Sequence, residues 1–290
     1  MNPPADADFG PAENAQLALL LEVAGTPKPG NVDRERDFPD LRFEHFLAGS
    51  VGSGAGLRAA AEGASVGEAF ERAVAGMSRQ EGGNTQFGAL LLLVPLVRAA
   101  ARTSGDEKLT PKAATAVVED TTVEDAANFY RAFDRVNVFV DDPPEDAEAL
   151  DVRRGSDAIP AVKERGVTLS DVLALGADED DVAAEWTNGF ERTFWAVDRL
   201  ADLDGPLSAR GARVYLELLS RKPDTLVAKQ HGKKVAESVR VRAQEALEGD
   251  AELLAAFADS LVADGVNPGT TADIAAAALF VALERGEVSV

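Results

Sequence analysis

Four short polar segments carry most of the side chains in this chain that could bind or transform a charged small molecule. They are residues 25–38, 82–85, 222–232 and 267–273. Each interrupts apolar sequence and supplies Lys, Arg, Asn, Thr or Asp. Amines, amides and hydroxyls bind phosphate oxygens, whereas carboxylates hold divalent cations or accept a proton from a hydroxyl group. The pattern indicates a site for a phosphorylated ligand built at helix ends.

The first segment is a rigid turn with charged side chains. Two prolines flank Lys28 and prevent the preceding helix from continuing. Asn31, Arg34 and Asp37 follow within ten residues. Such a turn holds its charged side chains in a fixed arrangement without needing a sheet. Taken alone, the segment reads equally well as an ordinary connector between two helices.

The second segment places Asn84 and Thr85 directly before the most apolar stretch of the chain. A simple helix N-cap explains these two residue types. The free amides and the positive dipole end of the following helix also favour an anion. Both interpretations hold together if the cap faces a cleft.

The last two segments add carboxylates, hydroxyls and an amine. The third contributes Asp224, Thr225 and Lys229, and the fourth contributes Asn267, Gly269, Thr270 and Asp273. Thr270 and Asp273 have the spacing of a capping box, which is the structural alternative. We favour a functional role for Asp273, because a bare cap needs neither Asn267 nor Gly269.

The order and spacing of these four segments resemble the triphosphoribosyl-dephospho-CoA synthases and their archaeal relatives over residues 15–283. Lys28-Pro29-Gly30 matches a Lys-Pro-Gly signature of that family, and Asn84-Thr85 and Asp224-Thr225 match its Asn-Thr and Asp-Thr pairs. The stretch 268–273 is similar to the family's Pro-Gly-Gly-Ser-Ala-Asp.

The resemblance implies an enzyme that moves the triphosphoribosyl group of ATP to a ribose hydroxyl of dephospho-CoA, or of a similar nucleotide-like acceptor, and releases adenine. It implies Mg²⁺ on the triphosphate. On this basis the expected catalytic and metal-binding residues are Asp37, Asp224 and Asp273. The expected ATP-binding residues are Lys28, Asn31, Arg34, Asn84, Thr85, Thr225, Lys229, Asn267, Gly269 and Thr270.

Three departures from the family pattern leave other functions open. Glu35-Arg36 stands where many synthases have a His before the Asp, Gln86-Phe87 replaces a His-Lys pair, and residues 229–232 replace an arginine- and glycine-rich stretch. One alternative is another ATP-using ribosyl transferase or N-glycohydrolase in a different coenzyme pathway. The other is a helical nucleotide-binding protein without catalytic activity.

Helical periodicity without alternating β-branched runs predicts an all-α multi-helix bundle, with no Rossmann or P-loop sheet. We expect residues 1–10 to be disordered and residues 11–290 to form one domain. The predicted helices are 11–23, 43–61 with a loosened part at 49–56, 66–77, 87–101, 122–134, 178–203, 206–219, 233–247, 251–263 and 271–284. Residues 103–111 are predicted as a polar loop and 136–168 as a partly irregular, exposed excursion.

A stripe of large apolar residues runs along the predicted helix 178–203. Trp186, Phe190, Phe194 and Val197 recur at helical spacing. Such a stripe could serve as a platform for adenine, but it is more typical of core packing. We predict packing. The glycines at 49–56 similarly predict a close helix–helix contact rather than a linker.

The composition of the chain limits the classes of binding partner and the cellular compartment that we expect for it. The 290 residues carry a formal net charge of −21 and no cysteine. This charge argues against a nucleic-acid partner and an anionic membrane surface. No run of 18 apolar residues and no signal peptide is evident, so we expect a cytoplasmic protein acting on small nucleotides. Five of the scarce lysines (Lys28, Lys222, Lys229, Lys233 and Lys234) lie in or beside the polar segments, which suggests an anionic ligand there.

The acidity also predicts adaptation to molar salt. At 1 M salt the Debye length is about 3 Å, so surface charges hardly repel one another, whereas in dilute buffer the repulsion is costly. We expect helical circular dichroism to be lost as KCl falls below a few tenths molar. A spectrum that is unchanged between about 3 M and 0.1 M KCl would show that the halophilic interpretation is wrong.

Overall fold

The computed structural model describes residues 9–103, 107–144 and 147–290. Within these residues α-helices dominate and there is no β-strand, only an isolated bridge between Asp33 and Arg36. The all-α prediction is confirmed, and the described part of the chain contains no sheet on which a Rossmann or P-loop site could be built. The disorder predicted for residues 1–10 falls mainly on residues 1–8, which lie outside the described residues.

The helices follow one another along the chain, and most begin or end within three residues of the predicted limits. They are α1 (Pro11–Ala24), α2 (Phe43–Ala61), α3 (Val66–Met77), α4 (Phe87–Arg102), α5 (Pro111–Glu119), α6 (Val123–Phe133), the 3₁₀ turns η1 (Glu148–Leu150) and η2 (Val152–Ala158), α7 (Ile159–Arg165), α8 (Leu169–Gly176), α9 (Asp181–Asn188), α10 (Glu191–Asp202), α11 (Leu207–Arg221), α12 (Thr225–His231), α13 (Lys233–Glu248), α14 (Ala251–Ala263) and α15 (Gly269–Glu284).

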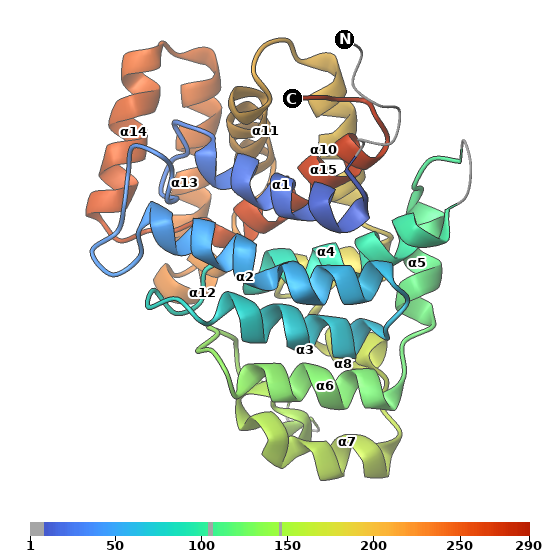
Figure 1. The fold of residues 1–290 in the computed structure, drawn as a ribbon. Coiled ribbons are helices and arrows are strands. Elements are labelled where there is room, and N and C mark those ends of the chain that lie inside the picture. The colour runs from blue at the N-terminus through green and yellow to red at the C-terminus, as the bar shows by residue number, and fades with distance from the viewer. Residues whose placement is uncertain (1–8, 104–106, 145–146) are drawn as a thin grey trace.

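Two almost wholly buried helices, α4 and α15, form the centre of the molecule. Their sequences are apolar on every side, which is typical of a helix surrounded by other helices. They pack against each other, and α15 also contacts α1, α10 and α11. In Figure 1 α15 passes behind α1, and α2, α3, α6 and α7 lie one below the next. Both central helices begin in a polar segment, so the core fixes where these segments lie.

The prediction that residues 49–56 loosen the helix is wrong, because α2 runs unbroken from Phe43 to Ala61. Its glycines instead allow backbone contact with α3. A Cβ atom on Gly76 would lie only 1.9 Å from the Gly52 carbonyl oxygen, and one on Gly56 would lie 2.3 Å from the Ala73 nitrogen. The predicted close helix–helix contact is therefore confirmed.

The predicted helix 178–203 is two helices. Gly189 and Phe190 adopt left-handed backbone angles, with φ of 79° and 62°, and separate α9 from α10. The Glu185 carboxylate then accepts hydrogen bonds from the Arg192 and Thr193 amides, at 3.1 and 2.8 Å, and so caps α10. Trp186, Phe190 and Val197 are buried in the core, so the apolar stripe serves packing, as predicted.

Three parts of the middle of the chain differ from the predictions. Helices α5 and α8 were not expected; Thr110 and Thr168 provide their N-caps. Within the stretch 136–168, residues 136–144 are irregular, as expected, but the described part is not simply exposed. Leu150, Ala158 and Val162 are buried against the core, because η2 and α7 pack on α6.

The glycine contact gives a stability prediction. Gly56→Ala should destabilise the fold by about 1–3 kcal/mol, because the added methyl collides with α3 backbone that cannot move aside. Gly176→Ala is the matched control within α8, since its Cβ would meet only the Ala183 methyl carbon, at 4.0 Å. Alanine should stabilise α8 there by roughly 0.5–1 kcal/mol. Urea unfolding in molar KCl measures both; equal midpoints for Gly56→Ala and wild type would contradict the packing account.

Candidate active site

The four polar segments meet at one cavity of about 620 Å³. Its walls come from α1, α2, α4, α6, η1, η2, α8, α9, α12 and α15 and from the stretch 137–144. Eight of the predicted site residues line it: Asn31, Asn84, Thr85, Lys229, Asn267, Gly269, Thr270 and Asp273. Residues separated by more than 200 positions thus share one concave surface, which is the arrangement expected of a small-molecule site.

Five predicted site residues do not line the cavity, and two of these, Arg34 and Asp37, are solvent-exposed. Asp37 accepts a hydrogen bond of 2.7 Å from the Phe43 amide, the first of α2. Its carboxylate therefore serves a helix start. The remaining three, Lys28, Asp224 and Thr225, lie behind the cavity wall and act on residues that form it.

Lys28 is a buried ion-pair partner and not an open phosphate contact. Only 1% of its surface is exposed. Its ammonium group pairs with Glu22 of α1 and donates a 3.0 Å hydrogen bond to Asn31 Oδ1. Asn31 Nδ2 in turn donates to Asn267 Oδ1 at 3.1 Å. Lys28 thus holds Glu22 and Asn31 directly and Asn267 through Asn31, and all three residues line the cavity.

Asp224 is also a positioning residue, because both of its carboxylate oxygens are occupied. Oδ1 accepts from the Val227 amide at 3.1 Å, and Oδ2 accepts from the amide and hydroxyl of Thr271 at 2.8 and 2.7 Å. The group is fully buried. Burial raises its pKa, although these hydrogen bonds act in the opposite direction. Asp224 therefore ties the start of α12 to the start of α15.

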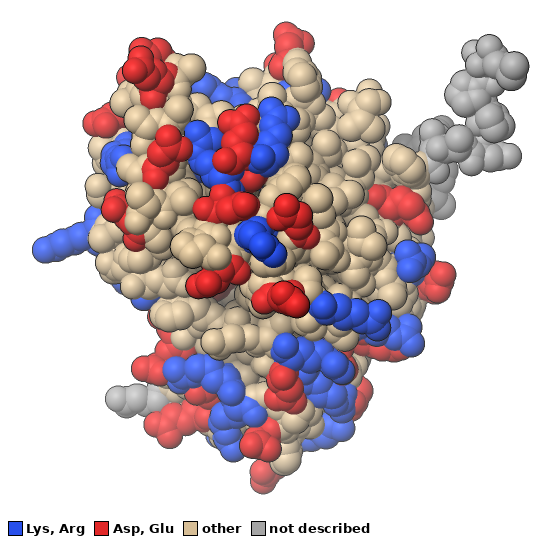
Figure 2. Space-filling model, turned by 60° about the vertical axis from the view of Figure 1, so that its left-hand side comes forward, with Lys and Arg blue, Asp and Glu red and all other residues tan. Residues whose placement is uncertain are grey.

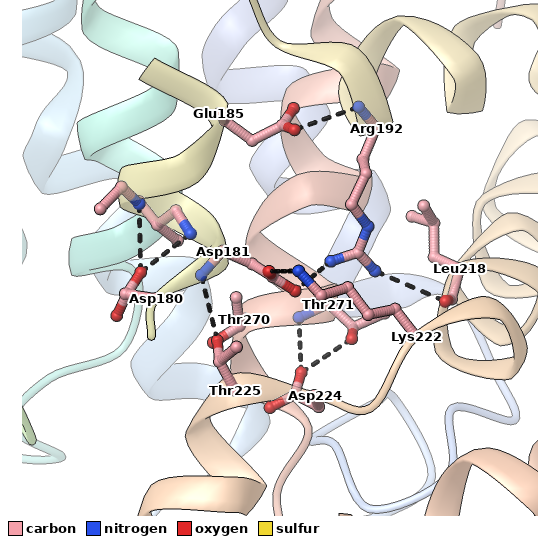
Figure 3. A network of polar contacts seen from close by, with 12 residues as sticks. Asp180, Asp181, Glu185, Arg192, Leu218, Lys222, Asp224, Thr225, Thr270 and Thr271 are labelled. Carbon is pink, nitrogen blue, oxygen red and sulfur yellow. Dashed lines mark hydrogen bonds and ion pairs between the residues drawn. The ribbon is translucent and has the colours of Figure 1, made fainter. Parts of the chain in front are cut away.

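A polar layer behind the cavity continues from Asp224 (Figure 3). The Thr225 hydroxyl accepts from the Asp181 amide and donates to the Thr270 hydroxyl, each at 3.2 Å. The buried Asp181 carboxylate pairs with Arg192 and Lys222. These contacts fix Thr270, the member of the layer that lines the cavity, against α9 and α12.

Asp273 is the predicted carboxylate that reaches the cavity. Gly88 makes room for it, since a Cβ there would lie 2.1 Å from Asp273 Oδ2. The carboxylate accepts a hydrogen bond from the Ala89 amide in the first turn of α4. Burial raises the pKa of Asp273 well above its usual range, and the nearby charges of Glu22, Asp224 and Asp180 raise it further. Burial likewise raises the pKa of Glu22, although Lys28 acts in the opposite direction.

The cavity wall is acidic rather than basic. Among the described residues that line it, Lys229 is the one cation, and it pairs with Asp180 at 2.6 Å and with Asp141 at 3.7 Å. The seven acidic lining residues are Glu22, Asp141, Asp142, Asp151, Glu179, Asp180 and Asp273. The expectation that clustered lysines surround an anion is therefore wrong for Lys28 and Lys222. Neither lines the cavity, and their ammonium groups are held by the carboxylates of Glu22 and Asp181.

The start of α4 does not offer the free anion site that its sequence suggested. Asn84 Oδ1 accepts from the Phe87 amide at 3.0 Å, and Asp273 accepts from the Ala89 amide. Asn84 thus supplies an acceptor to the first amide of α4 from beside the cleft, although the N-cap residue itself is Gln86, whose side chain makes no cap hydrogen bond.

The other part of the cavity is apolar. It is formed by side chains of α4, α6 and α8 and of residues 138–144 and 150–152, among them Leu91, Phe129, Phe133, Val138, Leu150 and Leu173. Phe139 and Leu175 also line it and are about half exposed, at 51% and 43%. A ligand with both a charged and an apolar portion would bury each against matching surface.

The three carboxylates predicted as metal ligands do not converge. Asp37 is exposed, Asp224 is saturated with hydrogen bonds, and only Asp273 lines the cavity. Among the described residues, no group of three or more His, Cys, Asp or Glu side chains is arranged to hold a metal ion. A divalent cation could therefore be held here by one or two carboxylates together with substrate phosphates, which is the usual pattern for Mg²⁺.

The model of the CitG family, described as ATP:dephospho-CoA triphosphoribosyl transferase, matches residues 9–289. The chain belongs to this family. The fold also resembles the crystal structure of a candidate triphosphoribosyl-dephospho-CoA synthase from Archaeoglobus fulgidus, with 27% identity and a TM-score of 0.68 over 83% of this chain and 99% of that one. No curated protein sequence matched. The alignment length and the fold agree with the resemblance found from the four polar segments.

Two cavity residues of this transferase were not proposed as site residues from the sequence. Glu22 lies two residues before the end of α1, where it reads as an ordinary helix residue. A lysine six positions later, Lys28, was the available signal. Gln86 was noted only as a departure from the family pattern, yet it lines the cavity beside Thr85.

No helix in the described part of this transferase is both long and apolar enough to cross a membrane.

The buried Lys28–Glu22 pair can be tested by removing one or both partners. Lys28→Met should cost about 3–5 kcal/mol of unfolding free energy, because Glu22 is left buried without its counter-charge. The double variant Glu22→Leu with Lys28→Met should recover most of that loss. Urea unfolding measures both. If Lys28→Met unfolds like wild type and loses only nucleotide affinity, Lys28 is a ligand contact instead.

Proposed function

We propose that the cavity is the active site of this transferase, where a ribose hydroxyl of dephospho-CoA, or of a similar nucleotide-like acceptor, attacks C1′ of ATP. The C1′–O bond forms as the C1′–N9 bond breaks. The acceptor hydroxyl loses its proton, and adenine takes up one proton as it leaves. The observation that carries the proposal is that the polar segments shared with the family meet in one cavity with a polar and an apolar portion.

The acidic wall suits this chemistry. Positive charge develops on C1′ and the ring oxygen as the glycosidic bond breaks, and fixed carboxylates nearby stabilise it. The apolar portion, including Phe129 and Phe133, keeps water from C1′ and so favours transfer over hydrolysis. A general base for the acceptor hydroxyl is available from the carboxylates of the same wall, of which Glu22 is held in place by Lys28.

The same wall requires a cation on the substrate. In the described part of the wall seven carboxylates and one lysine line the cavity, an arrangement that repels a triphosphate, so we propose that ATP enters with Mg²⁺. Asp273 and Glu22 fit the ion, because burial and mutual repulsion already oppose their ionisation and a cation relieves both effects. Bound there, Mg²⁺ would neutralise phosphate charge, while Lys229, Asn267 and Thr270 would orient the phosphate oxygens.

The setting follows from composition. We propose that residues 11–290 work as one domain, since residues of α1 and α15, far apart in the sequence, line the same cavity. We also propose that the protein acts on small nucleotides in the cytoplasm of a halophile. The net charge of −21 supports this assignment. On the face drawn in Figure 2, acidic and basic side chains are interspersed, so no continuous basic surface for nucleic acid is present on that face.

The experiment follows adenine release and Mg-ATP affinity in molar KCl. Asp273→Asn should weaken Mg-ATP binding at least tenfold, about 1.4 kcal/mol, and abolish adenine release, because Asn keeps the size but not the charge. Asp37→Asn is the matched control outside the cavity and should change neither. Wild type should release adenine only when dephospho-CoA is present.

Release of adenine without the acceptor would indicate a glycohydrolase. A folded wild type that gives no heat with Mg-ATP and releases no adenine would support the non-catalytic alternative. Equal loss in Asp273→Asn and Asp37→Asn would contradict the placement of the site in the cavity.

A further inference from the structure

A chain of three hydrogen-bonded side chains runs from the buried core to the cavity wall. It begins at the Lys28 ammonium group, passes through the Asn31 amide and ends at the Asn267 amide. Asn31 and Asn267 line the cavity, whereas Lys28 lies behind it. An amide has an oxygen that accepts hydrogen bonds and an NH₂ group that donates them. What the chain offers to a ligand therefore depends on which way each amide faces.

The charge of Lys28 fixes the orientation of both amides. An ammonium group can only donate, so the Asn31 atom 3.0 Å from Lys28 Nζ must be the oxygen. The Asn31 NH₂ group is then turned toward Asn267, and the Asn267 atom that lies 3.1 Å from it must be an acceptor, Oδ1. The NH₂ group of Asn267 is left as the free end of the chain.

A ligand can reach this NH₂ group. The Asn267 nitrogen has no hydrogen-bond partner among the described residues, yet it is not one of the polar atoms that are both buried and unpartnered. Asn267 is partly exposed and lines the cavity. The Lys229 ammonium group, by contrast, is held by Asp180 and Asp141. In a wall of carboxylates, Asn267 thus offers a donor that no described neighbour occupies.

We propose that Lys28 and Asn31 are positioning residues, which lock the Asn267 amide with its NH₂ group toward the cavity, where it donates to a phosphate oxygen of ATP. The inference rests on the proposed function, which places the triphosphate beside Asp273 of α15, and Asn267 immediately precedes that helix. A locked donor needs no reorganisation when the ligand binds. With the opposite orientation, the amide oxygen would face the phosphate and repel it.

Calorimetric titration of the intact protein with Mg-ATP in molar KCl tests the chain through a double-variant cycle. Asn267→Leu removes the donor and should weaken ATP binding roughly tenfold, as expected for a hydrogen bond to a charged group. Asn31→Asp keeps the size and the contact with Lys28, but an ionised carboxylate can only accept. Asn267 must then turn its NH₂ group toward position 31 and present its oxygen to the phosphate, so binding should again weaken roughly tenfold.

The cycle separates positioning from the added charge. In the Asn267→Leu background, Asn31→Asp should change ATP affinity by about twofold or less, because Asn31 acts through Asn267. Asn31→Leu is the uncharged second variant. It frees Asn267 to turn and should weaken binding by roughly threefold in wild type, but not in the Asn267→Leu background. Circular dichroism in molar KCl establishes that each variant is folded.

The phosphate itself is tested with inorganic tripolyphosphate and Mg²⁺, whose affinity should fall in Asn267→Leu by the same factor as that of ATP. If ATP alone loses affinity, a sugar or base atom is the partner and the proposal is overturned. If dephospho-CoA loses affinity in Asn267→Leu and Mg-ATP does not, the contact belongs to the acceptor, and the assignment to ATP is overturned.

Two further results separate this inference from the proposed function. If Asn267→Leu binds every ligand like wild type, or if the Asn31 variants lose as much affinity in the Asn267→Leu background as in wild type, the inference is overturned and the proposed function stands. Wild type that binds no Mg-ATP overturns both together.

Discussion

The buried ion pair between Lys28 and Glu22 is the interaction on which the site depends. It draws the first polar segment inward, against the end of α1, where Tyr215 of α11 also donates a 2.7 Å hydrogen bond to the Pro29 carbonyl. The same lysine holds Asn31, which reaches Asn267. Two charges in an apolar core are costly unless paired and hydrogen-bonded. The geometry of the cavity wall therefore follows from satisfying them.

A second constraint comes from helix starts. Asp224 is shared by the first turns of α12 and α15, and Asp273 reaches across to the first turn of α4. Carboxylates are stabilising at these positions because helix amides and dipoles favour negative charge. The consequence is an acidic cavity at the meeting point of several helix ends. A triphosphate can enter such a cavity only with a cation, and a developing oxocarbenium ion is favoured in it.

Much of the fold could be predicted from the sequence, because long apolar periodic stretches such as those of α4 and α15 have few alternatives to helix. The breaks were harder. Phe190 adopts a left-handed conformation, which the presence of Gly189 was not enough to predict. The Glu185 carboxylate that caps α10 after this break is brought there by tertiary packing. For the site, spacing identified the segments but not which side chains face inward. Lys28 and Asp224 look like ligand contacts in sequence; only the folded chain reveals that their charges are already occupied, and that Glu22 and Gln86 reach the cavity.

The most direct test of the account is a crystal structure of the protein with Mg²⁺ and a C-nucleoside analogue of ATP, in which a carbon–carbon bond replaces the glycosidic bond and prevents cleavage. The account predicts the nucleotide inside the cavity, with its phosphates and metal beside Asp273. A nucleotide bound outside the cavity, over the exposed Arg34 and Asp37, would contradict it.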